Sequence, residues 1–166
     1  MGLFSRKTHE DKPQPAEQPG FPPEPGDTVS DDRSQPAESQ PLGQEDQDRI
    51  AAALDRLQND GVAVEDLHSL SDGLDTAYRD WARTHEGDHG AIIERFAVGI
   101  GEHLSRRTDL DWRIVTDVFG TDLGLLDGPR GGFMVVPSNL VAARWMRGET
   151  GWIPGVVGHL VSCRER

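Results

Sequence analysis

The chain has 166 residues, with 29 acidic and 17 basic side chains and a formal net charge of −12. A negative field of this size repels phosphate backbones and anionic lipid surfaces, so we expect no nucleic-acid binding and no stable membrane association, whereas basic protein partners are compatible with it. A single cysteine cannot form an internal disulfide, and no apolar run approaches the roughly 18 residues that span a bilayer, so the sequence predicts a cytoplasmic protein.

The first forty-odd residues have the composition of a disordered tail. Residues 8–42 hold eight of the eleven prolines, and Gln, Glu, Ser and Asp fill most of the other positions. Such a segment cannot bury enough apolar surface to offset the entropy that it would lose on ordering. We therefore expect a disordered, Pro-rich, acidic tail over residues 1–42 and a single domain over residues 43–166.

Helical patterns open the domain. Apolar residues recur at helical spacing in its first segment, at Ile50, Leu54 and Leu57, and Asn59-Asp60-Gly61 supplies a stop. A second helix is predicted from Ser71, a favourable N-cap, with at most a short helical turn over residues 64–70 before it.

A third helix is predicted to begin after Asp88. Its apolar residues are spaced by four and form one buried stripe, made of Ile92, Phe96, Ile100 and Leu104. Gly99 and Gly101 lie inside this helix, where each costs about 1 kcal/mol relative to alanine. Close approach of another element would account for them.

The pattern then changes to short strands. Residues 112–119 are rich in aromatic and β-branched side chains, Gly120-Thr121-Asp122 resembles a hairpin turn, and residues 123–126 form the return strand. A second turn over residues 127–132 leads to a third strand over residues 133–136. The connections are too short for parallel crossovers, so the sequence predicts an antiparallel three-stranded β-meander.

Two more helices are predicted after the strands. Pro137 opens the first, with Ser138 or Asn139 as its cap and Gly148 as its end, and an apolar segment over residues 156–161 forms the second. Helices, then a small sheet, then helices indicate the α+β class, with helices packed on the meander.

One stretch matches a metallopeptidase pattern. His85-Glu86-Gly87-Asp88-His89 has the form H-E-x-x-H, in which two histidines one helical turn apart bind zinc and the glutamate activates water. That geometry requires a continuous helix, whereas Gly87 disfavours a helix and Asp88 favours a helix start. We therefore expect a loop and a cap here. Zinc-dependent hydrolysis through His85, Glu86 and His89 is kept as an alternative.

Other chemistry-bearing residues have structural explanations. The remaining histidines, His9, His68, His103 and His159, show no ligand spacing and are expected on the surface or hydrogen-bonded in the core. Three aspartates flank the first hairpin, Asp117, Asp122 and Asp127, and turns favour aspartate for backbone reasons. No phosphate-cradling glycine loop occurs in the sequence, and we expect no cofactor.

A cluster of interface-type residues lies between residues 144 and 152. It combines two tryptophans, a methionine and two arginines, which are enriched where proteins meet. One interpretation places the tryptophans in the core. The other predicts a partner-binding surface formed by Arg144, Trp145, Arg147 and Trp152.

The second half of the chain resembles an uncharacterised bacterial family, domain of unknown function 3806. The similarity covers roughly residues 70–150. It rests on the Trp112-led strand, the Gly120-Thr121-Asp122-Leu123 turn, and the strand that enters the helix at Pro137. The family has no assigned activity, cofactor or catalytic residue, so the resemblance implies a small bacterial α+β domain and nothing about mechanism.

Three functions stay open at this point. The first is a non-catalytic domain that binds a protein partner, the second is the zinc hydrolase, and the third is a small-ligand binder with a pocket between sheet and helices. We favour the first, because the sequence contains no convincing catalytic arrangement. Oligomeric state is left open.

Overall fold

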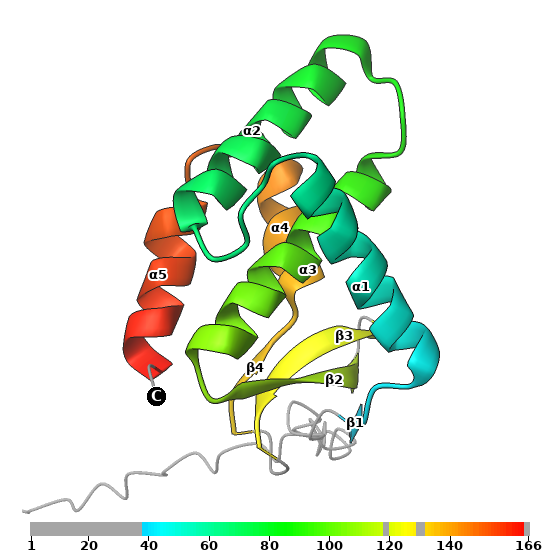
Figure 1. Cartoon of the computed structure of the whole chain (residues 1–166), viewed down its shortest axis with the longest axis vertical. Helices are drawn as coiled ribbons and strands as arrows, with labels where there is room; N and C mark the ends of the chain where they lie inside the picture. Colours follow the sequence, from blue (N-terminus) through cyan, green and yellow to red (C-terminus); the bar gives the residue numbers. More distant parts are fainter. Residues whose placement is uncertain (1–37, 118–119, 129–131, 165–166) are drawn as a thin grey trace, which may run out of the picture. The chain divides into compact units, whose positions relative to one another are not determined.

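The computed structural model describes residues 38–117, 120–128 and 132–164, which lie within one compact unit. It confirms the α+β class (Figure 1). In chain order the elements are β1 (Glu38–Gln40), α1 (Gln44–Asn59), α2 (Leu67–Thr84), α3 (His89–Arg107), β2 (Leu110–Asp117), β3 (Gly120–Asp127), β4 (Met134–Val135), α4 (Pro137–Trp145) and α5 (Ile153–Arg164).

The sheet has four antiparallel strands in the order β1-β2-β3-β4, so the prediction of three strands was wrong by one. The additional strand, β1, lies within the stretch predicted to be tail, and it pairs Glu38 with Thr116 and Gln40 with Ile114. Its three residues are polar and exposed. Only backbone hydrogen bonds define this strand, so the amino-acid composition of the segment did not predict it. The tail was predicted over residues 1–42, and its residues 1–37 lie outside the described residues.

The β2–β3 hairpin is longer than predicted. Gly120 and Thr121, expected in a turn, extend the ladder by pairing with Asp117 and Thr116. The hydroxyl groups of Thr116 and Thr121 also lie 2.8 Å apart across the hairpin. Two predicted strand residues, 118 and 119, and part of the predicted second turn, 129–131, lie outside the described residues.

Helix starts follow the capping side chains. As predicted, α3 begins after Asp88, whose carboxylate accepts a hydrogen bond from Gly90 N at 2.8 Å. The second helix, α2, begins at Leu67 and not at Ser71, because Asp66 caps it by accepting a hydrogen bond from His68 N at 2.8 Å. Ser71 is instead buried inside α2.

The last two helices also differ from their predicted bounds. Neither Ser138 nor Asn139 caps α4, because Pro137 occupies its first turn and Val136 precedes it without a side-chain cap bond. The final helix begins at Ile153, three residues before the predicted apolar segment. In the described part of the chain, no helix is both long enough and apolar enough to cross a membrane.

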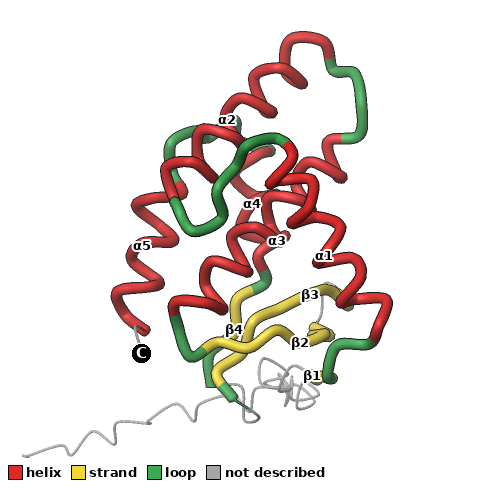
Figure 2. Tube along the Cα trace, viewed as in Figure 1, coloured by secondary structure: helices red, strands yellow, loops and turns green. Residues whose placement is uncertain are grey.

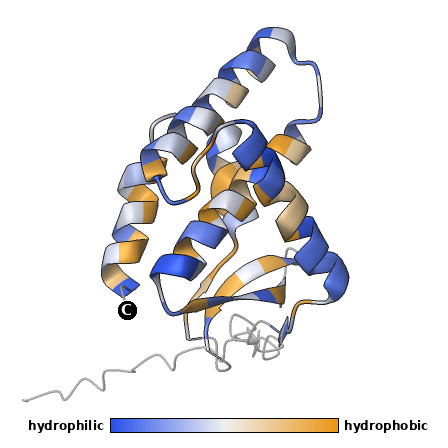
Figure 3. Cartoon of the chain, viewed as in Figure 1, coloured by the Kyte–Doolittle hydropathy of each residue, from blue (hydrophilic) through white to orange (hydrophobic). Residues whose placement is uncertain are grey.

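The central helix is α3, which contacts the other four helices and both long strands (Figures 1 and 2). Hydrophobic and hydrophilic residues alternate along the surrounding helices, as expected for elements with one buried side (Figure 3). The fully buried side chains include Leu57, Leu70, Phe96, Ile100, Leu104, Leu110, Leu125, Val141, Ile153 and Val157.

Both glycines inside α3 lie where another element approaches closely, as predicted. A Cβ on Gly99 would lie 2.7 Å from Leu57 Cδ1, and one on Gly101 would lie 2.1 Å from Cη2 of Trp112. Gly101 therefore allows the indole ring of Trp112 in β2 to pack directly on the backbone of α3.

Candidate functional site

The metallopeptidase-like stretch does not form one helical face. His85 is the C-cap of α2 in the left-handed conformation, with φ of 53°, and His89 is the first residue of α3. Both imidazoles pack against the ring of Trp81, with centroids 4.8 and 5.2 Å from it. Within the described residues no group of three or more His, Cys, Asp or Glu side chains could hold a metal ion. The geometry gives the zinc-hydrolase alternative no support.

Trp145 is a core residue, which corrects its assignment to a partner-binding surface. Only 5% of it is exposed, and its ring lies edge-on to Tyr78, with the centroids 4.9 Å apart, and 5.4 Å from Trp81. A ring enclosed in this way cannot contact a partner.

The other three residues of that predicted surface, Arg144, Arg147 and Trp152, lie closer to solvent. The guanidinium of Arg144 stacks on the half-buried ring of Trp152 at 4.6 Å. Arg147 donates a hydrogen bond to Glu149 at 2.6 Å, and Arg144 lies 3.7 Å from the same carboxylate. Arg144 and Arg147 thus share the carboxylate of Glu149. Without Trp145, these side chains do not form an aromatic docking surface.

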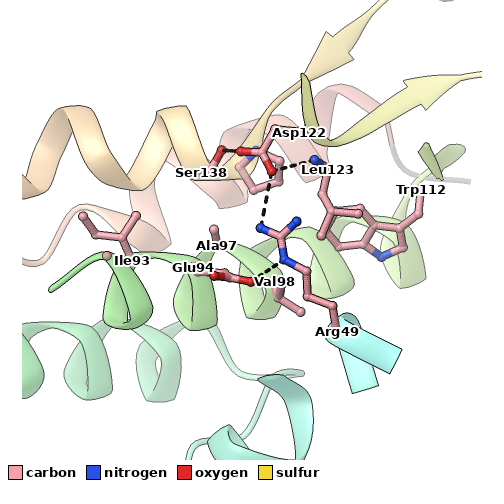
Figure 4. Close-up of a pocket in the computed structure, with 11 residues that line it drawn as sticks. Arg49, Ile93, Glu94, Ala97, Val98, Trp112, Asp122, Leu123 and Ser138 are labelled. Carbon is pink, nitrogen blue, oxygen red and sulfur yellow. Dashed lines mark hydrogen bonds and ion pairs between the residues drawn. The ribbon is translucent and has the colours of Figure 1, made fainter. Parts of the chain in front are cut away.

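A cavity opens elsewhere, between α1, α3, β3 and the first turn of α4 (Figure 4). Its volume is about 210 Å³. Its polar lining consists of Arg49, Glu94, Asp122 and Ser138, and its walls are formed by Ile93, Ala97, Val98, Trp112, Leu123 and Pro137, with Gly90 at one side.

The polar side chains of the cavity form one connected cluster. Arg49 Nε donates a hydrogen bond to Glu94 Oε1, and Arg49 Nη2 lies 3.6 Å from Asp122 Oδ1 (Figure 4). Asp122 also accepts hydrogen bonds from Ser138 Oγ at 2.5 Å and from Leu123 N at 2.7 Å. Asp122 is therefore more than a hairpin residue, because it joins β3 to α1 and α4.

The Arg49 guanidinium is held firmly in its charged form. Burial opposes that charge, but the hydrogen bond to Glu94 and the charges of Glu94, Asp122 and Asp46 outweigh burial and raise the pKa of Arg49 above its ordinary value. The cluster thus combines the Arg49 cation with two carboxyl groups, those of Glu94 and Asp122.

The lining of this cavity combines two carboxylates, a guanidinium group and a hydroxyl group. The described residues around the cavity include no histidine or cysteine, and the Ser138 hydroxyl donates to a carboxylate without an imidazole to act as a base. Arg49, Glu94 and Asp122 together carry one surplus negative charge, and no hydrogen bond to Glu94 Oε2 is found in the described part of the chain. A cation with an apolar stem would complement both the charge and the walls.

Sequence reasoning missed this cavity because its residues belong to no motif. Arg49, Glu94, Asp122 and Ser138 come from four separate elements. Asp122 was explained as a turn residue and Ser138 as a candidate helix cap, so neither was assigned to a site. The sequence predicted that helices pack on the sheet, but that prediction does not say where a cavity remains between them.

Comparisons of this chain with protein families, with curated proteins and with solved structures find no match. The resemblance to domain of unknown function 3806 therefore stays a prediction. The α+β fold with five helices and a four-stranded antiparallel sheet is established by the described residues themselves.

Proposed function

We propose that the domain is a non-catalytic interaction module that holds a basic side chain of a protein partner in the cavity beside Arg49. The observation that carries the proposal is the surplus negative formal charge of Arg49, Glu94 and Asp122 in the lining of a cavity whose other walls are mostly apolar. Arginine and lysine combine an aliphatic stem with a cationic head, which is the combination that this lining complements.

The size of the cavity supports a side chain as the occupant. About 210 Å³ is below the range of about 300–1,000 Å³ that is typical of drug-sized ligands. The cavity is thus suited to a single side chain or a very small molecule. The net charge of −12 also favours the approach of a basic partner through long-range electrostatic attraction.

The indole of Trp112 adds a further attraction for a cation. Its ring forms part of the cavity lining, while its Nε1 donates to Glu102 at 3.2 Å on the α3 side. Contact between a cation and an indole face contributes about 0.5–2 kcal/mol, depending on desolvation.

The proposal is tested with two capped tripeptides that differ only in charge, one with arginine at its centre and one with citrulline, the neutral isostere of arginine. Binding to the full chain is measured by calorimetry and by amide NMR. We expect the arginine peptide to bind at least about tenfold more tightly, since a charged hydrogen bond contributes about 1.5–3 kcal/mol. The perturbed amides should surround Glu94 and Asp122.

Glu94→Gln removes the surplus charge while an amide oxygen can still accept from Arg49. This variant should lose the preference for arginine, whereas Glu86→Gln, at an exposed acid on the loop outside the cavity, should keep it. Equal affinity for the two peptides would refute the proposal. Binding of free arginine as tightly as the peptide would instead identify the cavity as a small-ligand site, the remaining alternative.

A further inference from the structure

A second cavity lies at the other end of α3, between the start of α2, the last turns of α3 and α5. It has a volume of about 380 Å³, within the range typical of small-molecule sites. Its polar lining is Glu65, Asp66, His68, His103 and Arg107, and its apolar lining is Leu67, Pro154, Gly158 and Val161.

His103 is the informative residue of this cavity. It is only 4% exposed, and its Nδ1 lies 2.8 Å from the carbonyl oxygen of Val64. A carbonyl oxygen can only accept, so Nδ1 must carry the hydrogen, and Nε2 of the neutral ring is left with a free lone pair.

The cavity that His103 lines offers space in which this lone pair can accept a hydrogen bond. No hydrogen bond to Nε2 is found among the described residues, yet Nε2 is not one of the fully enclosed side-chain atoms without a partner, which are Arg95 Nε and Trp145 Nε1. An atom of a buried side chain that is neither bonded nor enclosed must face open space. The cavity that His103 lines is that space.

A cation stands next to this acceptor. His103 and Arg107 are four residues apart on α3, so they are neighbours on one helix face. Arg107 is exposed and has no ion pair within the described residues. Glu65 shares Arg106 with Glu102, while Asp66 caps α2 by accepting a hydrogen bond from His68 N.

The carboxylates of this lining are only partly balanced by cations. Arg106 is shared between Glu65 and Glu102, so it does not neutralise Glu65 alone, and Asp66 and Arg107 contribute one charge of each sign. A ligand with a net negative charge is therefore not favoured. A zwitterion meets both kinds of charge, because its cationic end can donate to His103 Nε2 beside Asp66, and its anionic end can pair with Arg107.

We propose that this second cavity binds a free α-amino acid with an apolar side chain. The ammonium group donates to His103 Nε2, the carboxylate pairs with Arg107, and the side chain packs on Leu67, Pro154 and Val161. The site is separate from the cavity beside Arg49, so the inference does not depend on the function proposed above.

The test uses full-length protein labelled with isotopes at histidine, titrated with leucine, N-acetyl-leucine and leucine methyl ester. Acetylation removes the ammonium group and esterification removes the carboxylate. Leucine should shift the ring resonances of His103 saturably, and both derivatives should bind at least about tenfold more weakly. Absence of a saturable shift with leucine, or equal binding of either derivative, would overturn the proposal.

Two variants assign the contacts. His103→Asn can still donate to the Val64 carbonyl but offers no acceptor in the place of Nε2, and Arg107→Gln removes the cation. Amide resonances of Leu67 and Val161, which report on the cavity walls, should then show at least about tenfold weaker leucine binding in each variant. Arg56→Gln, at an exposed position on α1, should bind as the wild type does. If His103→Asn does not fold, Arg107→Gln and the two derivatives still decide the matter, and unchanged affinity in Arg107→Gln would count against the site.

Discussion

The two ends of α4 belong to regions of opposite character. At its first turn Ser138 faces a hollow lined by long charged side chains, and at its last residue Trp145 closes a packed aromatic cluster with Tyr78 and Trp81. The three aromatic rings pack against one another, with centroids 4.9 to 6.5 Å apart. Arg49, Glu94 and Asp122 are held together by ion pairs and leave space beside them. The aromatic end is therefore expected to contribute mainly to stability, and the charged end contains the cavity for which we propose a binding function.

The largest effect on the free energy of unfolding is expected at the aromatic end of α4. Trp145→Ala removes a ring that is 5% exposed, and we expect it to lower the free energy of unfolding by about 3–5 kcal/mol through the lost burial and the cavity left behind. Chemical denaturation measures this change. The neighbouring Met146, which is 77% exposed, provides the control, since Met146→Ala should change stability by less than about 0.5 kcal/mol. A small effect of Trp145→Ala would show that the cluster is not part of the core.

A medium effect on the free energy of unfolding is expected beside the cavity that contains Arg49, where Trp112 packs on α3. Gly101→Ala places a Cβ 2.1 Å from the ring of Trp112, and the displaced indole should cost about 1–3 kcal/mol despite the better helix propensity of alanine. Gly155→Ala is the matched control in α5, where a Cβ would meet no atom within 4 Å. The control should raise stability by about 0.5–1 kcal/mol. If both substitutions stabilise the protein, Trp112 does not need its close approach to α3.

The smallest effect is expected at Asp75, which joins α2 to the turn between α4 and α5. Burial raises the pKa of its carboxyl group above the ordinary value, although the hydrogen bond from Gly151 N at 2.9 Å and the charge of Arg79 act in the opposite direction. The folded state thus binds the proton more tightly than the unfolded chain does. Stability should therefore fall as the pH rises from the ordinary pKa of an aspartate through the raised pKa of Asp75.

Asp75→Asn should remove that decline, because an amide oxygen still accepts from Gly151 N and carries no charge. The midpoint of thermal unfolding, followed from acidic to neutral pH, should rise slightly at neutral pH relative to the wild type. Asp55→Asn removes the same charge from an exposed position on α1 and should leave the slope unchanged. A slope that survives in Asp75→Asn would assign it to another carboxyl group.

The parts of the fold that could be predicted are those that local sequence patterns determine. Helix α3 was predicted from Asp88 and the stripe at Ile92, Phe96, Ile100 and Leu104, because capping and periodicity act within one segment. The hairpin of β2 and β3 was predicted for the same reason, from β-branched and aromatic residues that flank a glycine turn.

The parts that could not be predicted depend on tertiary contacts. The cavity beside Arg49 exists because four elements meet around residues that look ordinary in the sequence, and the lone pair of His103 depends on a carbonyl 39 residues away at Val64. The most prominent residues were misleading for a related reason. Tryptophan is typical both of interfaces and of cores, and only the packing of α4 decides between them for Trp145.

The short strand β1 has a practical consequence for work on the isolated domain. It pairs along residues 114–116 of β2, so it covers one border of the sheet. A fragment that begins at Gly43 would leave the N–H and C=O groups of that border without partners, next to Ile114 and Val115. Bare borders of this kind pair with copies of themselves, so such a fragment is expected to self-associate and to precipitate on concentration, whereas a fragment that keeps Glu38–Gln40 should stay dispersed.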